Sequence, residues 1–417
     1  VINGGGIEKL IISKEVTKLP SSFCTGTENL TTVEFENGAQ LKEIGENAFY
    51  SNSALESINI PSTVTSIGNA AFADCFGLKK AELGQVEFLG ENIFARCSAL
   101  ETVKIQGTSD TVYPSNTFST WSTGHSAAPL KTLEIGAGKI KFTLNNQKES
   151  IETITLGDGV TEIPANFADG CAKLTSISLP DALTAVPVSA FRNCTALTEV
   201  KISKDSNLQS IGGYAFQNTA LTKMYIPKDV TSIGESAFFR TPITVFDMSD
   251  VLTENMTVGT NAINNWYSQD DKANWPTWKE SFKYIYVSNS GAAASVKANT
   301  NVCTYAFFVT NGGKIDAAKT GFDAVSRPGY TAEWHKQADF SDAAYKDESK
   351  DRGIYYAKWI LNDSTNTIEV TYDANISGVT AKTYAEIKGN EHPAKASSFS
   401  RAGYTFTGRS EERRVGK

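Results

Sequence analysis

The sequence has little of what most enzyme active sites require. Its 417 residues include only 3 His, and none of His125, His335 and His392 lies in a His-Glu-x-x-His or other metal-binding spacing. The Gly-x-Ser-x-Gly motif, which exposes the nucleophile of many serine hydrolases, is missing. Gly136–Lys139 lacks the spacing and the following Ser or Thr of a phosphate-binding loop, so we interpret it as a turn. We therefore expect a protein that is not an enzyme and needs no metal and no cofactor.

Positive charge and long apolar runs are also scarce. The chain has 39 Lys and Arg against 46 Asp and Glu, a net charge of -7, which argues against a nucleic-acid partner. No apolar run approaches the ~20 residues that a membrane-spanning helix needs. The first residues, VINGGGIEKL, lack an initiator Met and the profile of a signal peptide, and a repeat begins almost at once. We expect the sequence to be a fragment of a longer chain.

A unit of mostly 22 to 25 residues recurs along the first two-thirds of the chain. Its clearest copy is LESINIPSTVTSIGNAAFADC, from Leu55 to Cys75, in which the first apolar residues alternate as in a short strand. Phe72 and Cys75 are three apart, which predicts a helical or 3₁₀ turn. This period and a Leu-x-x-Ile-x-Ile strand are typical of a leucine-rich solenoid, in which each unit must stack on the next to bury its apolar face. The units begin at Ile7, Leu30, Leu55, Leu78, Leu100, Leu130, Ile151, Leu174, Leu197, Leu221 and Ile243.

One aromatic residue and often one cysteine close each unit. The aromatic positions are Phe49, Phe72, Phe94, Phe167, Phe191, Phe216 and Phe238. Four of the six Cys follow them by three or four residues (Cys75, Cys97, Cys171 and Cys194), so we expect a ladder of buried, reduced thiols rather than a disulfide framework. The pattern fails between Leu100 and Ser150, where one unit lengthens and the next loses its Ala-Phe step.

The repeat resembles a known family. Units of the form L-x-x-I-x-I-P-x-x-V-x-x-I-G-x-x-A-F-x-x-C, seen in the copies at Leu55 and Leu221, resemble the BspA-like leucine-rich repeats of bacterial surface proteins over residues 7–250. The resemblance implies a non-enzymatic protein of the bacterial cell surface, or a secreted one, that acts in adhesion. Its partner would be a host or neighbouring-cell surface protein or an extracellular matrix protein.

The C-terminal third has a different pattern. Thr253–Val287 carries several Trp and ends in an expected last strand, Phe282–Val287, which would cap the solenoid. Beyond it, SRPGYTAEW and GIYYAKW, and later SRAGYTFTG, resemble the Listeria–Bacteroides repeat, a small β-rich module known from internalin-type stalks. The last nine residues, RSEERRVGK, resemble a translated sequencing adapter.

These observations predict an α/β repeat solenoid of about eleven turns, mostly short β-strands joined by short helical or 3₁₀ turns, followed by small β-rich modules. The predicted parts are the capped solenoid (1–287), a linker (288–301), one β-rich module (302–360), a second, truncated module (361–408) and an artefactual tail (409–417).

The side chains that point outward between the buried positions of the strands are the predicted binding site. Small hydroxyls and mixed charges dominate this row, which suits a protein partner. The candidate residues are Glu34, Asn59, Glu82, Lys104, Glu134, Lys201 and Tyr225.

Two alternatives remain open at this point. One is a polysaccharide-binding surface protein that uses loop residues, of which the candidates are Trp121, His125, Trp266, Trp275 and Trp278. The other is the binding region of a larger surface enzyme whose catalytic domain lies outside this sequence.

Overall fold

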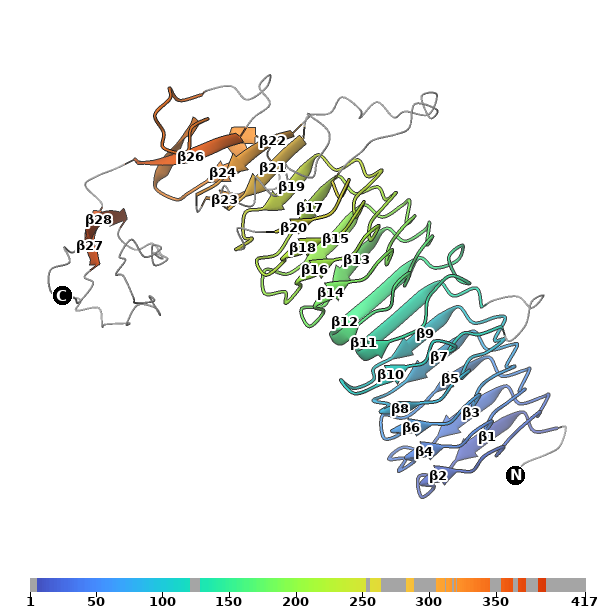
Figure 1. Cartoon of the computed structure of the whole chain (residues 1–417). Helices are drawn as coiled ribbons and strands as arrows, with labels where there is room; N and C mark the ends of the chain where they lie inside the picture. Colours follow the sequence, from blue (N-terminus) through green and yellow to red (C-terminus); the bar gives the residue numbers. More distant parts are fainter. Residues whose placement is uncertain are drawn as a thin grey trace, which may run out of the picture.

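The repeats form a parallel β-solenoid. The computed structural model describes residues 6–120, 128–252, 256–263, 283–288, 305–311, 313–316, 319, 321–345, 354–362, 367–372 and 382–387. Each coil carries one longer strand, and most coils also carry a two-residue strand on a second side, so that two rows of strands run along an elongated stack (Figure 1). The predicted solenoid of about eleven turns is confirmed. The turn predicted at Gly136–Lys139 is wrong, because these residues belong to a strand, Thr132–Ile140.

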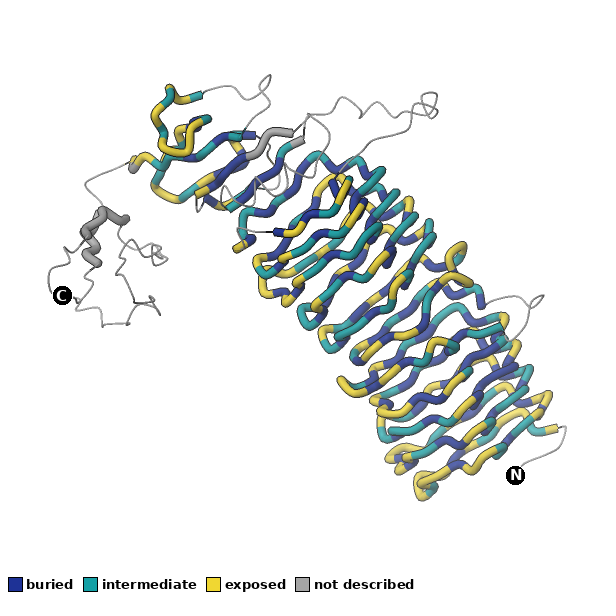
Figure 2. The backbone as a smooth tube through the Cα atoms, in the orientation of Figure 1, coloured by how far each residue is buried: buried dark blue, intermediate teal, exposed yellow. Residues whose placement is uncertain are grey.

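The longer strands pair in parallel with the next coil over most of the stack. They are β1 (Lys9–Ile12), β3 (Thr32–Phe35), β5 (Ser57–Asn59), β7 (Lys80–Leu83), β9 (Thr102–Ile105), β11 (Thr132–Ile140), β12 (Thr153–Glu162), β13 (Ser176–Leu179), β15 (Glu199–Ile202), β17 (Lys223–Tyr225), β19 (Val245–Met248) and β21 (Lys283–Val287). The two-residue strands are β2 (Lys18–Leu19), β4 (Glu43–Ile44), β6 (Ser66–Ile67), β8 (Phe88–Leu89), β10 (Val112–Tyr113), β14 (Ala185–Val186), β16 (Ser210–Ile211), β18 (Ser232–Ile233) and β20 (Thr257–Val258). Buried residues alternate with more exposed ones along many of the strands (Figure 2), and the buried ones belong to one apolar core that runs through the coils.

The third side of each coil is a run of turns and not the helical or 3₁₀ turn that the sequence predicts. Around Phe49, the N–H groups of Asn47, Phe49 and Ser51 donate to carbonyls of the next coil. Asn47 and Ser51 have φ values of 54° and 61°, in the left-handed region that Asn tolerates better than most residues. Because alternate N–H groups bind the neighbouring coil, they are not free for the bonds within one coil that a helix needs.

The Phe of each coil contacts the Phe of the next. Phe49 and Phe72 stack with ring centroids 5.5 Å apart, and Phe191 and Phe216 do the same at 5.5 Å. The irregular region between Leu100 and Ser150 continues this ladder, because the ring centroids of Phe118 and Phe142 lie 5.1 Å apart. The unit of Leu130 does lack the Ala-Phe step, as expected, but Phe142, only two residues after Ile140, supplies the ring instead.

Glycine follows the short strand in many coils because the backbone of the previous coil lies against it. A Cβ at Gly68 would lie 2.5 Å from the backbone N of Glu46, and one at Gly234 would lie 2.3 Å from that of Gly213. These distances leave no room for a side chain, so the Ile-Gly step of the repeat is a packing requirement.

The sheet does not end with the solenoid. The predicted last strand is present as β21, and β22 (Tyr305–Val309) adds to it in parallel. Strand β26 (Ile354–Leu361) then pairs in parallel with β22 and antiparallel with β25 (Tyr330–His335). One sheet, β17-β19-β21-β22-β26-β25, therefore joins the last solenoid coils to the region predicted as a separate module (Figure 1).

A second apolar core covers the outward face of this sheet. Tyr286, Phe308 and Tyr355 occupy outward positions and are fully buried. Trp334 packs edge-to-face on Phe308 at 5.5 Å and stacks on Phe322 at 4.9 Å. Phe322 belongs to the 3₁₀ helix η3 (Gly321–Ala324), which is followed by β24 (Val325–Ser326), the antiparallel partner of β23 (Lys314–Ile315).

The remaining described strands form a hairpin. β27 (Thr367–Tyr372) and β28 (Lys382–Ile387) pair with each other in antiparallel orientation. Apart from Leu361 and Asn362, the rest of the predicted second module lies outside the described residues, as do the tail and all of the predicted linker except Ser288. Within the described part of the chain, no helix is long and apolar enough to cross a membrane.

Candidate binding face on the longer strands

The predicted site residues lie on one face of the stack. Asn59, Glu82, Lys104 and Glu134 are direct partners on consecutive strands β5, β7, β9 and β11, and Thr155 on β12 follows. Glu34 occupies the same position on β3, opposite Ile11 of β1. Glu34, Asn59 and Lys201 are exposed, whereas Glu82, Lys104, Glu134 and Tyr225 are half-buried. We call these outward side chains the strand face.

The charges of the strand face are paired with one another. Lys104 Nζ lies 2.8 Å from Glu134 Oε1, and this hydrogen bond raises the pKa of Lys104. Glu34 pairs with Lys9 at 2.7 Å. Glu82 pairs with Lys80 at 2.8 Å, and Lys201 with Glu199 at 3.4 Å. Exposed pairs of this kind contribute at most about 1 kcal/mol each, so a partner can replace them at little cost.

Three depressions interrupt the strand face where the pairing of the longer strands is reduced or absent. Between β3 and β5 pairing is reduced to Thr32 and Ser57. The sheet breaks between β12 and β13 and again between β15 and β17. The depressions at these places have volumes of about 610, 210 and 580 Å³, in chain order.

The two larger depressions occur where a unit is two residues longer than usual. Six residues separate Ile60 from Ile67, but eight separate Phe35 from Ile44, and eight separate Ile202 from Ile211. The extra residues lie directly after the longer strand. The predicted residues Glu34 and Asn59 line the depression of about 610 Å³. Lys201 and Tyr225 line the depression of about 580 Å³.

Tyr225, which lines the depression next to β15, has acidic neighbours. The Tyr225 hydroxyl donates to Asp250 Oδ2 at 2.9 Å. Burial raises the pKa of the Tyr225 phenol, and the charges of Asp250, Asp247 and Asp205 raise it further. Burial also raises the pKa of Asp247, and the charge of Asp250 adds to the shift.

Comparison with known protein families agrees with this geometry. The model of the BspA type leucine rich repeat region matches residues 3–123 and 136–266. The chain belongs to this family. A comparison with curated proteins gives no match.

Solved structures of other leucine-rich repeat proteins are distantly similar. A leucine-rich repeat protein from Bacteroides ovatus is 19% identical, with a TM-score of 0.30 over 67% of this chain and 55% of that chain. This chain thus spans about half the length of that protein. The pneumococcal vaccine antigen PcpA is 17% identical, with a TM-score of 0.29 over 71% of this chain and 77% of that chain. A leucine rich cell surface protein from Faecalibacterium prausnitzii is 19% identical, with a TM-score of 0.23 over 61% and 78% of the two chains.

The BspA-type coils also carry ion pairs on the turn side, which the sequence reasoning missed. Arg96 donates through Nε and Nη2 to both carboxylate oxygens of Asp74, which is only 3% exposed. A hydrogen bond to Asp74 raises the pKa of Tyr50. Arg192 and Asp169 form the equivalent pair, with Nε 3.1 Å from Oδ1. The available signal was the recurrence of opposite charges one or two residues after the Phe of consecutive units.

The cysteines line the interior of the coils. Cys24, Cys75, Cys97, Cys171 and Cys194 are free and buried. Burial raises the pKa of the Cys75 thiol to about 12, and that thiol donates to the carbonyl of Phe49 in the previous coil. The expected burial of the ladder is confirmed, and the thiols also serve as hydrogen-bond donors.

The loop candidates for glycan binding lie outside the described residues. These are Trp121, His125, Trp266, Trp275 and Trp278. Among the described residues, no group of three or more His, Cys, Asp or Glu is arranged to hold a metal ion.

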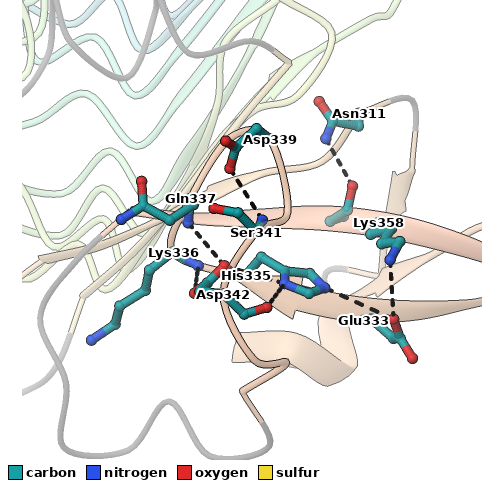
Figure 3. Close-up of polar contacts among 10 residues, drawn as sticks. Asn311, Glu333, His335, Lys336, Gln337, Asp339, Ser341, Asp342 and Lys358 are labelled. Carbon is teal, nitrogen blue, oxygen red and sulfur yellow. Dashed lines mark hydrogen bonds and ion pairs between the residues drawn. The ribbon is translucent and has the colours of Figure 1, made fainter.

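A polar cluster in the C-terminal region surrounds His335, which is 3% exposed. Its Nδ1 lies 3.0 Å from the carbonyl oxygen of Asp342 and 3.2 Å from Oδ1 of the same residue (Figure 3). Burial opposes ionisation of Asp342, but the backbone N–H groups of Lys336 and Gln337 donate to its carboxylate and lower its pKa overall. These contacts close the loop after β25, so we assign the cluster a structural role.

Proposed function

We propose that this chain is a non-enzymatic adhesion protein of the bacterial cell surface, or a secreted one, and that it binds a protein partner through the strand face. The partner would be a host or neighbouring-cell surface protein or an extracellular matrix protein. The observation that carries the proposal is the strand face itself: a row of mostly polar side chains along the parallel strands, interrupted by depressions between β3 and β5, between β12 and β13 and next to β15. The surface location rests on the resemblance of the repeats to those of bacterial surface proteins.

The rigidity of the stack supports a binding role. Parallel pairing and the Phe ladder fix the strand face before a partner arrives, so association loses less conformational entropy than it would on a flexible surface. The paired charges favour a broad polar contact, because a partner can exchange exposed ion pairs without leaving a charge buried and alone. Membership of a repeat family that is typically non-catalytic agrees with this proposal.

We infer that residues 302–360 form a Listeria–Bacteroides-type module and that residues 361–408 belong to a second one, which together begin a stalk. The apolar core around Trp334 supports this assignment for the first module. The pairing of β22 with β21 would attach the stalk rigidly to the solenoid.

The test uses the full chain, immobilised and screened against extracellular matrix proteins and a panel of polysaccharides. Each hit is repeated with Glu34, Glu82, Lys104 and Lys201 changed to Ala together. The matched control changes Lys18, Glu43, Lys141 and Glu162 to Ala, which removes the same charges from two exposed ion pairs elsewhere on the coils.

We expect a protein hit that the strand-face variant loses and the control variant keeps. A protein hit indifferent to both variants would contradict the placement of the site. A polysaccharide hit that the strand-face variant keeps would instead favour the glycan alternative.

A further inference from the structure

The depression over β15, which extends from Asp158 and Asp181 in the coils before it to Tyr225 of β17, differs from a plain gap between coils because its floor is apolar. Val200 and Ile202 of β15 are partly exposed, whereas the matching residues Ile177 and Leu179 of β13 are 2% and 5% exposed. No backbone pairing joins β15 to β17, both of which the structure describes in full. We call this depression the β15–β17 groove. It presents apolar surface among outward side chains that are mostly polar.

Among the described residues, the basic side chains at the rim of the groove form ion pairs, whereas two of the acidic ones do not. The two lysines of the groove already have partners: Lys201 lies 3.4 Å from Glu199, and Lys204 lies 3.1 Å from Asp250. Asp158 and Asp181 also line the groove, and neither forms an ion pair with any residue that the structure describes. The groove thus keeps two carboxylates whose charge is not neutralised.

Acidic side chains also lie around Tyr225, whose hydroxyl donates a hydrogen bond to Asp250 Oδ2 at 2.9 Å. Asp205, Asp247 and Asp250 act together on Tyr225, whose ionisation they oppose. The groove therefore has carboxylates along its rim and aliphatic side chains on its floor.

We infer that the β15–β17 groove receives a basic segment of the partner protein, with an arginine or lysine next to an apolar side chain. The inference rests on the proposed function and names the chemistry of its partner. The apolar side chain covers Val200 and Ile202, and the cation binds Asp158 and Asp181. Arginine fits best, because its planar guanidinium binds carboxylates through two parallel hydrogen bonds.

The test measures the binding of short synthetic peptides to the full chain by fluorescence anisotropy. The probe peptide alternates leucine and arginine at its centre. One comparison peptide has glutamate for arginine, and the other has serine for leucine. The groove variant is Asp158→Asn with Asp181→Asn, and the matched control is Glu15→Gln with Asp110→Asn, which removes two acidic charges that are exposed and unpaired among the described residues.

We expect the groove variant to bind the probe about tenfold more weakly and the control variant to bind it as the original chain does. The glutamate peptide should not bind, and the serine peptide should bind more weakly than the probe. Equal affinities for the groove variant and the original chain would overturn the inference, as would equal binding of the serine peptide.

The outcome is separable from that of the proposed function. If the strand-face variant loses its protein partner while the groove variant keeps the peptide, the inference is wrong and the proposed function stands. If the peptide depends on Asp158 and Asp181 but the screen yields no protein partner, the groove inference is supported and the proposed function is not.

Discussion

Removing one ring from the middle of the Phe ladder should lower stability strongly. Phe191 is fully buried, stacks on Phe216 with centroids 5.5 Å apart and meets Phe167 edge-to-face at 6.2 Å. Loss of a buried Phe side chain forfeits about 1.5–3 kcal/mol of transfer free energy, and each lost ring pair adds about 0.5–1.5 kcal/mol. We expect Phe191→Ala to lower the free energy of unfolding by about 3–5 kcal/mol, the range found for cavities of this size.

The assay is urea unfolding followed by far-ultraviolet circular dichroism. Phe88→Ala is the matched control, because Phe88 is 58% exposed on β8 and its loss should change stability by less than about 0.5 kcal/mol. Each coil contacts only its neighbours, so the cavity should also uncouple the two halves of the stack and broaden the transition. Equal unfolding midpoints for Phe191→Ala and Phe88→Ala would refute the claim that the ladder holds the coils together.

Three further predictions follow from single contacts. Gly234→Ala should destabilise the chain by roughly 1–3 kcal/mol, because its Cβ would lie 2.3 Å from backbone; Gly213→Ala, whose Cβ would meet its nearest neighbour at 3.2 Å, should cost less in the same urea assay. Asp74→Asn should cost roughly 1–3 kcal/mol, since it breaks an ion pair whose carboxylate is buried, whereas Glu34→Gln should cost less than about 1 kcal/mol. Burial raises the pKa of the Cys75 thiol from 9.0 to about 12. The protonated thiol therefore contributes to stability below pH 9, and this contribution is lost as the pH rises towards 12. Between these pH values the urea midpoint of the Cys75→Ala variant should fall less than that of the original chain.

The periodic parts of the fold are predictable because they depend on local pattern. The apolar steps of each unit fix which residues face inward, and with them the strands and the outward row that includes Asn59 and Lys104. The place of Phe142 in the Phe ladder was not predicted, because the unit that carries it lacks the Ala-Phe step. Packing requires only that an aromatic ring lie between Phe118 and Phe167, whichever residue supplies it. The turn conformation was missed for a similar reason. A spacing of three suggests a helical turn, but bonds to the next coil decide the backbone.

Contacts between different coils and between distant parts of the chain are harder to predict, because a local pattern does not say which residues will meet. The pair of Arg96 with Asp74 depends on two coils meeting in a particular register. Strands β21 and β22 pair although the segment between them (288–301) has the composition of a linker. Small, polar composition predicts how a segment behaves alone and does not predict which strands its ends will join.

The depressions show why the site is harder to predict than the fold. Two extra residues after the strand loosen pairing at Phe35 and at Ile202, and a groove follows in both places. The unit of Leu100 also gains a residue after its strand, yet there the space is filled: Thr111 is buried, and the Tyr113 hydroxyl donates to the carbonyl of Ala137 on the long strand β11. The length of one unit therefore creates the possibility of a groove, and the strand of the next coil decides whether it opens. Prediction of binding grooves in such solenoids must therefore compare consecutive units, because the sequence of one unit alone does not decide whether a groove opens.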